Sequence, residues 1–97
     1  MRTEEGWKMF LTLCLEAKKT SRLEELFNLF FTHEEKDHLS SRMQIIKALL
    51  DQNLSQREIS ESMKVSISQI TRGSNALKIV SDDLLHFLES FTGSYKK

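Results

Sequence analysis

The chain has 97 residues, no proline and a formal net charge of zero. A chain of this length forms one domain near the lower limit for a good hydrophobic core, so a partner subunit is expected to help bury apolar surface. Apolar residues recur at intervals of three and four, which predicts an all-α fold, and no segment reaches the roughly 18–20 apolar residues of a membrane span. The single cysteine, Cys14, excludes an internal disulfide and fits a reducing cytoplasm.

The N-terminal part predicts two helices with much apolar surface. The first is expected from about Thr3 to Lys19, with an apolar stripe over residues 7–15. The second is expected to follow Ser21. Its apolar residues occupy more than one face, which predicts burial between subunits. They are Leu23, Leu26, Phe27, Leu29, Phe30 and Phe31.

Three capping boxes predict the starts of the next helices. Thr32 with Glu35 opens a long helix that is expected to end near Asp51. Ser55 and Ser66, each followed three residues later by glutamate or glutamine, predict two short helices. The apolar stripe expected on the long helix comprises Leu39, Met43, Ile46 and Leu50.

A last helix is expected to start at Ser81 and to carry acidic residues in its first turn. Residues 93–97 are expected to form a frayed tail. The core face predicted for this helix comprises Leu84, Phe87, Leu88 and Phe91.

The two short helices have the apolar spacing of a helix-turn-helix, which needs a fixed steep corner. In this motif, apolar side chains at positions 4, 8, 10 and 15 are buried at the corner. Counted from Gln56 as position one, all four positions of this chain are apolar. Position 9, often glycine, is Lys64, which would have to adopt a left-handed backbone. The alternative is a plain helical corner without DNA binding. The apolar residues at the four positions are Ile59, Met63, Val65 and Ile70.

DNA binding, if present, is expected in residues 56–80, where four basic residues outnumber two acidic ones. Small and β-branched residues at the start of the second short helix would let its backbone approach base edges closely. Arg57 and Lys64 could reach guanine or phosphate, and Gln56, Ser60 and Lys78 are expected at the phosphate backbone. For Glu58, Glu61 and Ser62 a solvated surface position is favoured. The predicted DNA-binding set is Gln56, Arg57, Ser60, Lys64, Ile67, Ser68, Gln69, Thr71 and Lys78.

The strings LSQRE and ITRGSNALK in this chain strongly resemble the Trp repressor family. The resemblance is detailed from about Leu29 to about Phe91. It implies a six-helix, intertwined homodimer with two helix-turn-helix heads. It also implies a transcriptional repressor of tryptophan-related genes that takes L-tryptophan as corepressor. On this reading residues 1–53 form the dimerisation helices, 54–75 the helix-turn-helix and 81–92 the C-terminal helix of one domain, 1–97.

The resemblance also implies a corepressor site. Arg42 and Arg72 would sandwich the indole, since guanidinium planes stack on aromatic faces. Thr32 would lie near the ligand carboxylate and Gly73 close to the ligand. The main-chain carbonyls of the other subunit would hold the ammonium. The implied set is Leu29, Phe31, Thr32, Arg42, Arg72, Gly73 and Ala76.

Three positions depart from the family pattern. Ala76 replaces a serine that helps to bind the ammonium, which predicts weaker tryptophan binding or another indole as corepressor. Gln69 replaces a small hydroxyl residue and Ser66 a glycine. The alternative function is a tryptophan-independent DNA-binding or protein-interaction dimer on the same fold. No Ser-His-acid or metal-ligand spacing appears among His33, His38 and His86, so neither an enzyme nor a metal or other cofactor is expected.

Overall fold

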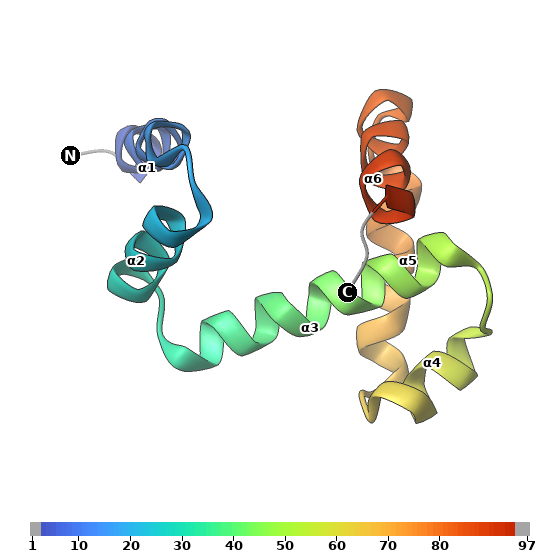
Figure 1. Cartoon of the computed structure of the whole chain (residues 1–97). Coiled ribbons are helices and arrows are strands. Elements are labelled where there is room, and N and C mark those ends of the chain that lie inside the picture. Colours follow the sequence, from blue (N-terminus) through green and yellow to red (C-terminus); the bar gives the residue numbers. More distant parts are fainter. Residues whose placement is uncertain (1–2, 95–97) are drawn as a thin grey trace. The chain divides into compact units, whose positions relative to one another are not determined.

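The computed structural model describes residues 3–94 of the chain (Figure 1). Within this range the secondary structure is entirely helical, which confirms the all-α prediction. None of these helices combines the length and apolar character needed to cross a bilayer. The helices are α1 (Thr3–Ala17), α2 (Thr20–Phe30), α3 (His33–Asp51), α4 (Gln56–Met63), α5 (Ile67–Ile79) and α6 (Asp82–Ser94).

The chain divides into two compact units, and the division falls inside α3. The first unit ends at His38 and contains α1, α2 and the start of α3. The second unit begins at Leu39 and contains the rest of α3 together with α4, α5 and α6. The resemblance implies that residues 1–53, which include α3, form the dimerisation helices, and within the single chain the second half of α3 belongs to the same unit as the helix-turn-helix.

The capping boxes form as predicted. At the start of α3, the Thr32 amide donates to Glu35 Oε1 at 2.8 Å and the Glu35 amide donates to Thr32 Oγ1 at 3.1 Å. At the start of α4, the Ser55 amide donates to Glu58 Oε1 at 2.8 Å and the Glu58 amide donates to Ser55 Oγ at 3.1 Å. Each box satisfies two amides that the helix itself leaves without acceptors.

Three helix ends differ from the sequence prediction. Helix α1 ends at Ala17 instead of Lys19, because Lys18 has a left-handed backbone with φ 64°. Helix α2 begins at Thr20, before the expected start, and its N-cap Lys19 has an extended backbone without a side-chain cap. Helix α6 continues through Gly93, part of the expected frayed tail, to Ser94. The rest of that predicted tail lies outside the described residues.

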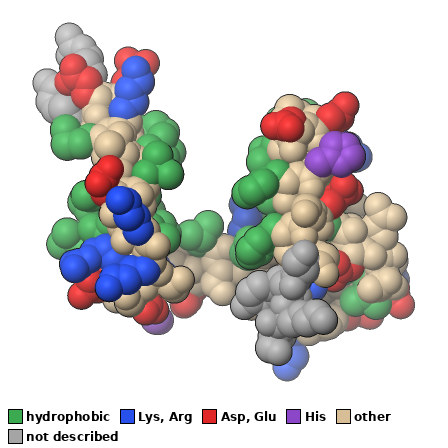
Figure 2. Space-filling model, turned by 45° about the horizontal axis from the view of Figure 1, so that its top comes forward, with side chains coloured by type: hydrophobic (Ala, Val, Ile, Leu, Met, Phe, Trp, Pro, Cys, Tyr) green, Lys and Arg blue, Asp and Glu red, His purple; other side chains and the backbone are tan. Residues whose placement is uncertain are grey.

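The first unit has little buried surface. Its described residues include only one buried hydrophobic residue, Ala17. The Phe10 ring lies 6.0 Å from that of Phe27 and 5.9 Å from that of Phe31, measured between centroids, so aromatic contacts join α1 to the end of α2. Figure 2 shows hydrophobic side chains on the surface of these helices and of α6. The predicted excess of apolar surface on α2 is therefore confirmed for the single chain.

The second unit has a small core at the contact of α3, α4 and α5. Its centre comprises Ile45, Ile59 and Ile70, all at most 1% exposed. The stripe predicted on α3 is wrong at its first two positions, because Leu39 and Met43 are exposed. Helix α3 is apolar on adjacent faces, and the face that packs is the one with Ile45. Further apolar residues around this core are Ala48, Leu49, Met63 and Val65.

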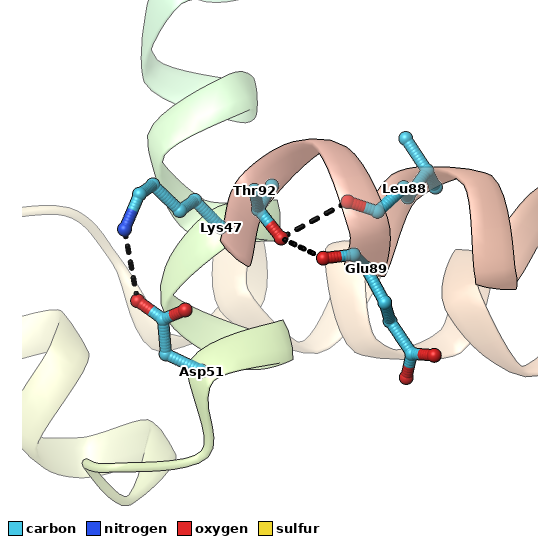
Figure 3. A network of polar contacts seen from close by, with 5 residues as sticks. All are labelled: Lys47, Asp51, Leu88, Glu89 and Thr92. Carbon is cyan, nitrogen blue, oxygen red and sulfur yellow. Dashed lines mark hydrogen bonds and ion pairs between the residues drawn. The ribbon is translucent and has the colours of Figure 1, made fainter. Parts of the chain in front are cut away.

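The predicted core face of α6 is also wrong in the single chain. Phe87 is 68% exposed and Phe91 52%. Of the predicted residues only Leu88 is partly covered, and it shares its face with Leu85 and Thr92, which also repeat at three and four positions. The Thr92 hydroxyl is buried and donates to the main-chain carbonyls of its own helix, 3.0 Å from Leu88 O and 3.3 Å from Glu89 O (Figure 3). This helix therefore presents its aromatic face outward.

Candidate nucleic-acid interface and ligand residues

Helices α4 and α5 form a tight corner through Lys64. This residue has φ 57° and ψ 43°, the left-handed conformation that the sequence required. Its amide donates to the Ser60 carbonyl, which also accepts from the Val65 amide at 3.2 Å. The side chains at the four corner positions are buried or packed against the core, as predicted. The corner therefore has the geometry of a helix-turn-helix.

Ser60 serves the turn itself. Its hydroxyl is half-buried and donates to the Val65 carbonyl at 2.6 Å. A hydroxyl has one hydrogen, and a phosphate oxygen needs a donor. In this arrangement Ser60 therefore holds the corner and has no hydrogen left for the phosphate contact expected from the sequence.

The start of α5 is exposed, as expected for a recognition helix. Ile67 is 49% exposed, and Ser68 and Thr71 are exposed as well. The Thr71 hydroxyl donates to the Ile67 carbonyl at 3.0 Å, which leaves its lone pairs and methyl group facing outward. Apolar methyl groups and hydroxyl acceptors thus lie at the end of the helix that would meet base edges.

The cations of this segment are available to a polyanion. Arg57, Lys64, Arg72 and Lys78 are all exposed, as is Gln56. Within residues 3–94, none of these four cations forms an ion pair with a carboxylate. Glu58, the neighbour of Arg57 in the sequence, is held in the capping box of α4. Within the part of the chain that the structure describes, these cations are therefore not paired with carboxylates.

Four of the predicted ligand residues belong to the second unit. Arg42 on α3 and Arg72 on α5 are exposed, and Ala76 is half-buried. Gly73 is buried where α5 packs on α3: a Cβ there would lie 3.1 Å from Ile45 Cγ2 and 3.4 Å from Leu49 Cδ1. The helix contact therefore leaves little room for a side chain at this position. The resemblance had assigned it only to the approach of the ligand.

The other three predicted ligand residues belong to the first unit. Leu29 lies in the last turn of α2, whose carbonyls have no N–H donor within the helix, and its side chain is 74% exposed. Phe31 is the C-cap of the same helix. Thr32 uses its hydroxyl oxygen as an acceptor for the Glu35 amide, so the hydroxyl hydrogen can still be donated to a ligand. Carbonyls at the end of α2 are well suited to hold an ammonium group.

A groove between α3 and α6 was not predicted from the sequence. It has a volume of about 500 Å³. At its edge Lys47 Nζ lies 3.0 Å from Asp51 Oδ2 (Figure 3). None of the predicted site residues lines it. The apolar residues Met43 and Phe91 line the groove, but the sequence does not show that they are exposed or that they face one another. The lining residues are Ser40, Met43, Gln44, Lys47, Ala48, Asp51, Phe91 and Thr92.

The corner, its buried wedge and its exposed cations place the chain in the class of helix-turn-helix DNA-binding proteins. The family model described as Trp repressor protein matches residues 5–92. The chain therefore belongs to the Trp repressor family, a family of DNA-binding transcription regulators and not of enzymes.

Relatives from several bacteria carry the name Trp operon repressor homolog. The protein from Chlamydia trachomatis serovar D is 50% identical over 86 residues, which cover 89% of this chain and 92% of the relative. The protein from Chlamydia caviae is 44% identical over 92 residues, or 95% and 91% of the two chains. The protein from Histophilus somni strain 2336 is 38% identical over 88 residues, or 91% and 83%.

Proposed function

We propose that this protein is a sequence-specific DNA-binding repressor of tryptophan-related genes, with L-tryptophan as its corepressor. It acts in the cytoplasm as a homodimer. The observation that supports this best is the helix-turn-helix head, in which four exposed cations lie on or beside a recognition helix and have no carboxylate partner within the described residues. Membership of the Trp repressor family supports the same function.

L-tryptophan suits the chemistry of the ligand residues. Arg42 and Arg72 are both exposed, so their guanidinium groups can stack on an indole, and one can pair with the ligand carboxylate. Thr32 can donate its hydroxyl hydrogen to the same carboxylate. The carbonyls of Leu29 and Phe31 of the partner subunit would accept from the ammonium group.

Ala76 favours a second candidate function. Without a hydroxyl at this position, the ligand ammonium loses a hydrogen bond, and a bond to a charged group contributes about 1.5–3 kcal/mol, or roughly 10-fold to 100-fold in affinity. If the remaining contacts to L-tryptophan are too weak, the same fold would act as a tryptophan-independent dimer that binds DNA or another protein. A further alternative is a dimer that binds another indole as its ligand.

DNA binding with and without L-tryptophan tests the proposed function. We expect the protein to select one palindromic sequence from a random duplex library, and L-tryptophan to raise its affinity for that sequence. Since basic side chains would displace counterions from phosphates, affinity should fall steeply with salt. Equal affinity with and without L-tryptophan would support the second candidate, and failure to select any sequence would exclude both DNA-binding functions.

The proposed homodimer can be tested by measuring the molecular mass of the protein in solution. The described part of the first unit buries a single hydrophobic residue, and Leu15 and Leu29 are more than 70% exposed. This surface is too apolar for a stable monomer. Sedimentation equilibrium at micromolar concentration should therefore give twice the mass of the 11.3 kDa chain. A folded monomer at that concentration would contradict the proposed assembly.

A further inference from the structure

The two helices of the head begin with capping boxes that differ in one atom. At α4 the third residue is Glu58, and at α5 it is Gln69. In both boxes a side-chain oxygen accepts from the N-cap amide, at 2.8 Å from Ser55 N and at 3.1 Å from Ser66 N. The other terminal atom is a second carboxylate oxygen at Glu58 and an NH2 group at Gln69. Both side chains can cap a helix, so capping alone does not explain the glutamine.

The side-chain oxygen of Gln69 is occupied by hydrogen-bond contacts within the capping box. It accepts from the Ser66 amide and lies 3.4 Å from the Ser66 hydroxyl, which can donate to it. The Ser66 hydroxyl oxygen in turn accepts from the Gln69 amide at 3.3 Å and lies 3.0 Å from Ser68 Oγ. Both donors face the same atom of the Gln69 side chain, which identifies that atom as the oxygen. The NH2 group, with two hydrogens, is the part of the side chain that can bind a ligand.

We propose that Gln69 contacts operator DNA through this NH2 group while its oxygen holds the start of the recognition helix. The inference rests on the proposed DNA-binding function and names the chemistry of one contact. The partner must be a hydrogen-bond acceptor, which is a phosphate oxygen, guanine O6 or N7, thymine O4 or adenine N7. Bidentate recognition of adenine is excluded, because it needs the amide oxygen to accept from N6. A glutamate here would cap α5 equally well but would set a carboxylate against the phosphates.

Exchanging the two residues tests the proposal. Gln69→Glu keeps the box of α5 and removes the donor. Combined with Glu58→Gln, it keeps the net charge and both boxes, and it exchanges the NH2 group of α5 with the carboxylate of α4. Glu58→Gln alone is the matched control. We expect both proteins with Gln69→Glu to bind the selected operator roughly 10-fold more weakly than the parent, since a hydrogen bond to a charged group is lost. Their thermal midpoints should match that of the parent, and the control should bind at least as tightly.

The outcomes are distinguishable. Uniform weakening that persists at high salt, where repulsion by the new carboxylate is screened, identifies a phosphate contact, and altered preference at one base identifies a base contact; either supports the proposal. Weakening that disappears at high salt overturns it. Parent-like affinity of the double variant overturns it, as does a loss of affinity that accompanies a lower thermal midpoint. So does a Gln69-dependent preference for adenine that is lost when the N6 amino group of the adenine is removed, because that contact needs the amide oxygen as an acceptor. If the parent protein selects no DNA sequence, both the proposed function and the Gln69 contact are excluded. If the parent binds its operator and the double variant binds equally well, only the Gln69 contact is excluded.

Discussion

Replacing Ile70 with alanine is expected to unfold the helix-turn-helix head. Ile70 is 0% exposed and meets Ile45 and Ile59 in the core of the second unit. Truncating a buried isoleucine costs about 2–5 kcal/mol, because transfer free energy is lost and a cavity remains. Small domains have total stabilities of only about 5–15 kcal/mol. With so few fully buried side chains, the rest of this core cannot compensate for such a loss.

Urea unfolding monitored by circular dichroism measures this effect, at one fixed protein concentration because a dimer's stability depends on it. Ile79 provides a matched control in the same helix, since its side chain is 85% exposed. Ile79→Ala should change the free energy of unfolding by no more than about 0.5 kcal/mol. If the two variants unfold at the same urea concentration, Ile70 is not the centre of the core.

The features that could be predicted from the sequence are those set by neighbours along the chain. A capping box needs only four consecutive residues, and Ser55 and Ser66 therefore gave the starts of α4 and α5 correctly. The left-handed backbone at Lys64 followed from the spacing of the apolar residues around the turn. Ile67 was expected on the exposed face because it lies in the first turn of α5, where a recognition helix meets base edges, and it is 49% exposed. These residues position the candidate DNA-binding face.

The features that could not be predicted depend on contacts between distant segments. Helix α3 is apolar on adjacent faces, and only its packing against α4 and α5 selects the face with Ile45. The resemblance implies that Gly73 lies close to the ligand, and the structure adds that a Cβ there would lie only 3.1 Å from Ile45 Cγ2 across the helix contact. Ser60 appeared to be a surface hydroxyl until the turn brought the Val65 carbonyl within 2.6 Å. Spacing along one helix carries no information about these neighbours.

The core face predicted for α6 contains two aromatic residues that are exposed in the single chain. Phe87 and Phe91 have the spacing of a core face, and the prediction assumed that the core lies within one chain. In the single chain they are exposed, and Phe91 lines the groove between α3 and α6. This is the pattern expected if the proposed dimer, and not the single chain, buries the apolar faces. The same argument applies to the exposed leucines of α1 and α2.

Replacing Arg72 with alanine is expected to abolish the response to L-tryptophan while leaving the fold intact. Arg72 is exposed on α5, and Ile70, two residues earlier, points into the core on the opposite face. Its removal would take away an indole-stacking plane and the charge that pairs with the ligand carboxylate. Isothermal calorimetry should give no heat of tryptophan binding for Arg72→Ala, and its urea unfolding should match that of the parent.

Two further variants separate the parts of this site. Arg72→Lys keeps the charge and loses the planar guanidinium, so binding should be weaker than in the parent but stronger than in Arg72→Ala. Ala76→Ser adds a hydroxyl beside the proposed ammonium position and should tighten binding by roughly 10-fold or more, the contribution of one hydrogen bond to a charged group. Unchanged tryptophan binding in Arg72→Ala would remove this arginine from the proposed site. A parent without measurable heat that Ala76→Ser restores would instead show that the alanine alone disables tryptophan binding on an otherwise competent scaffold.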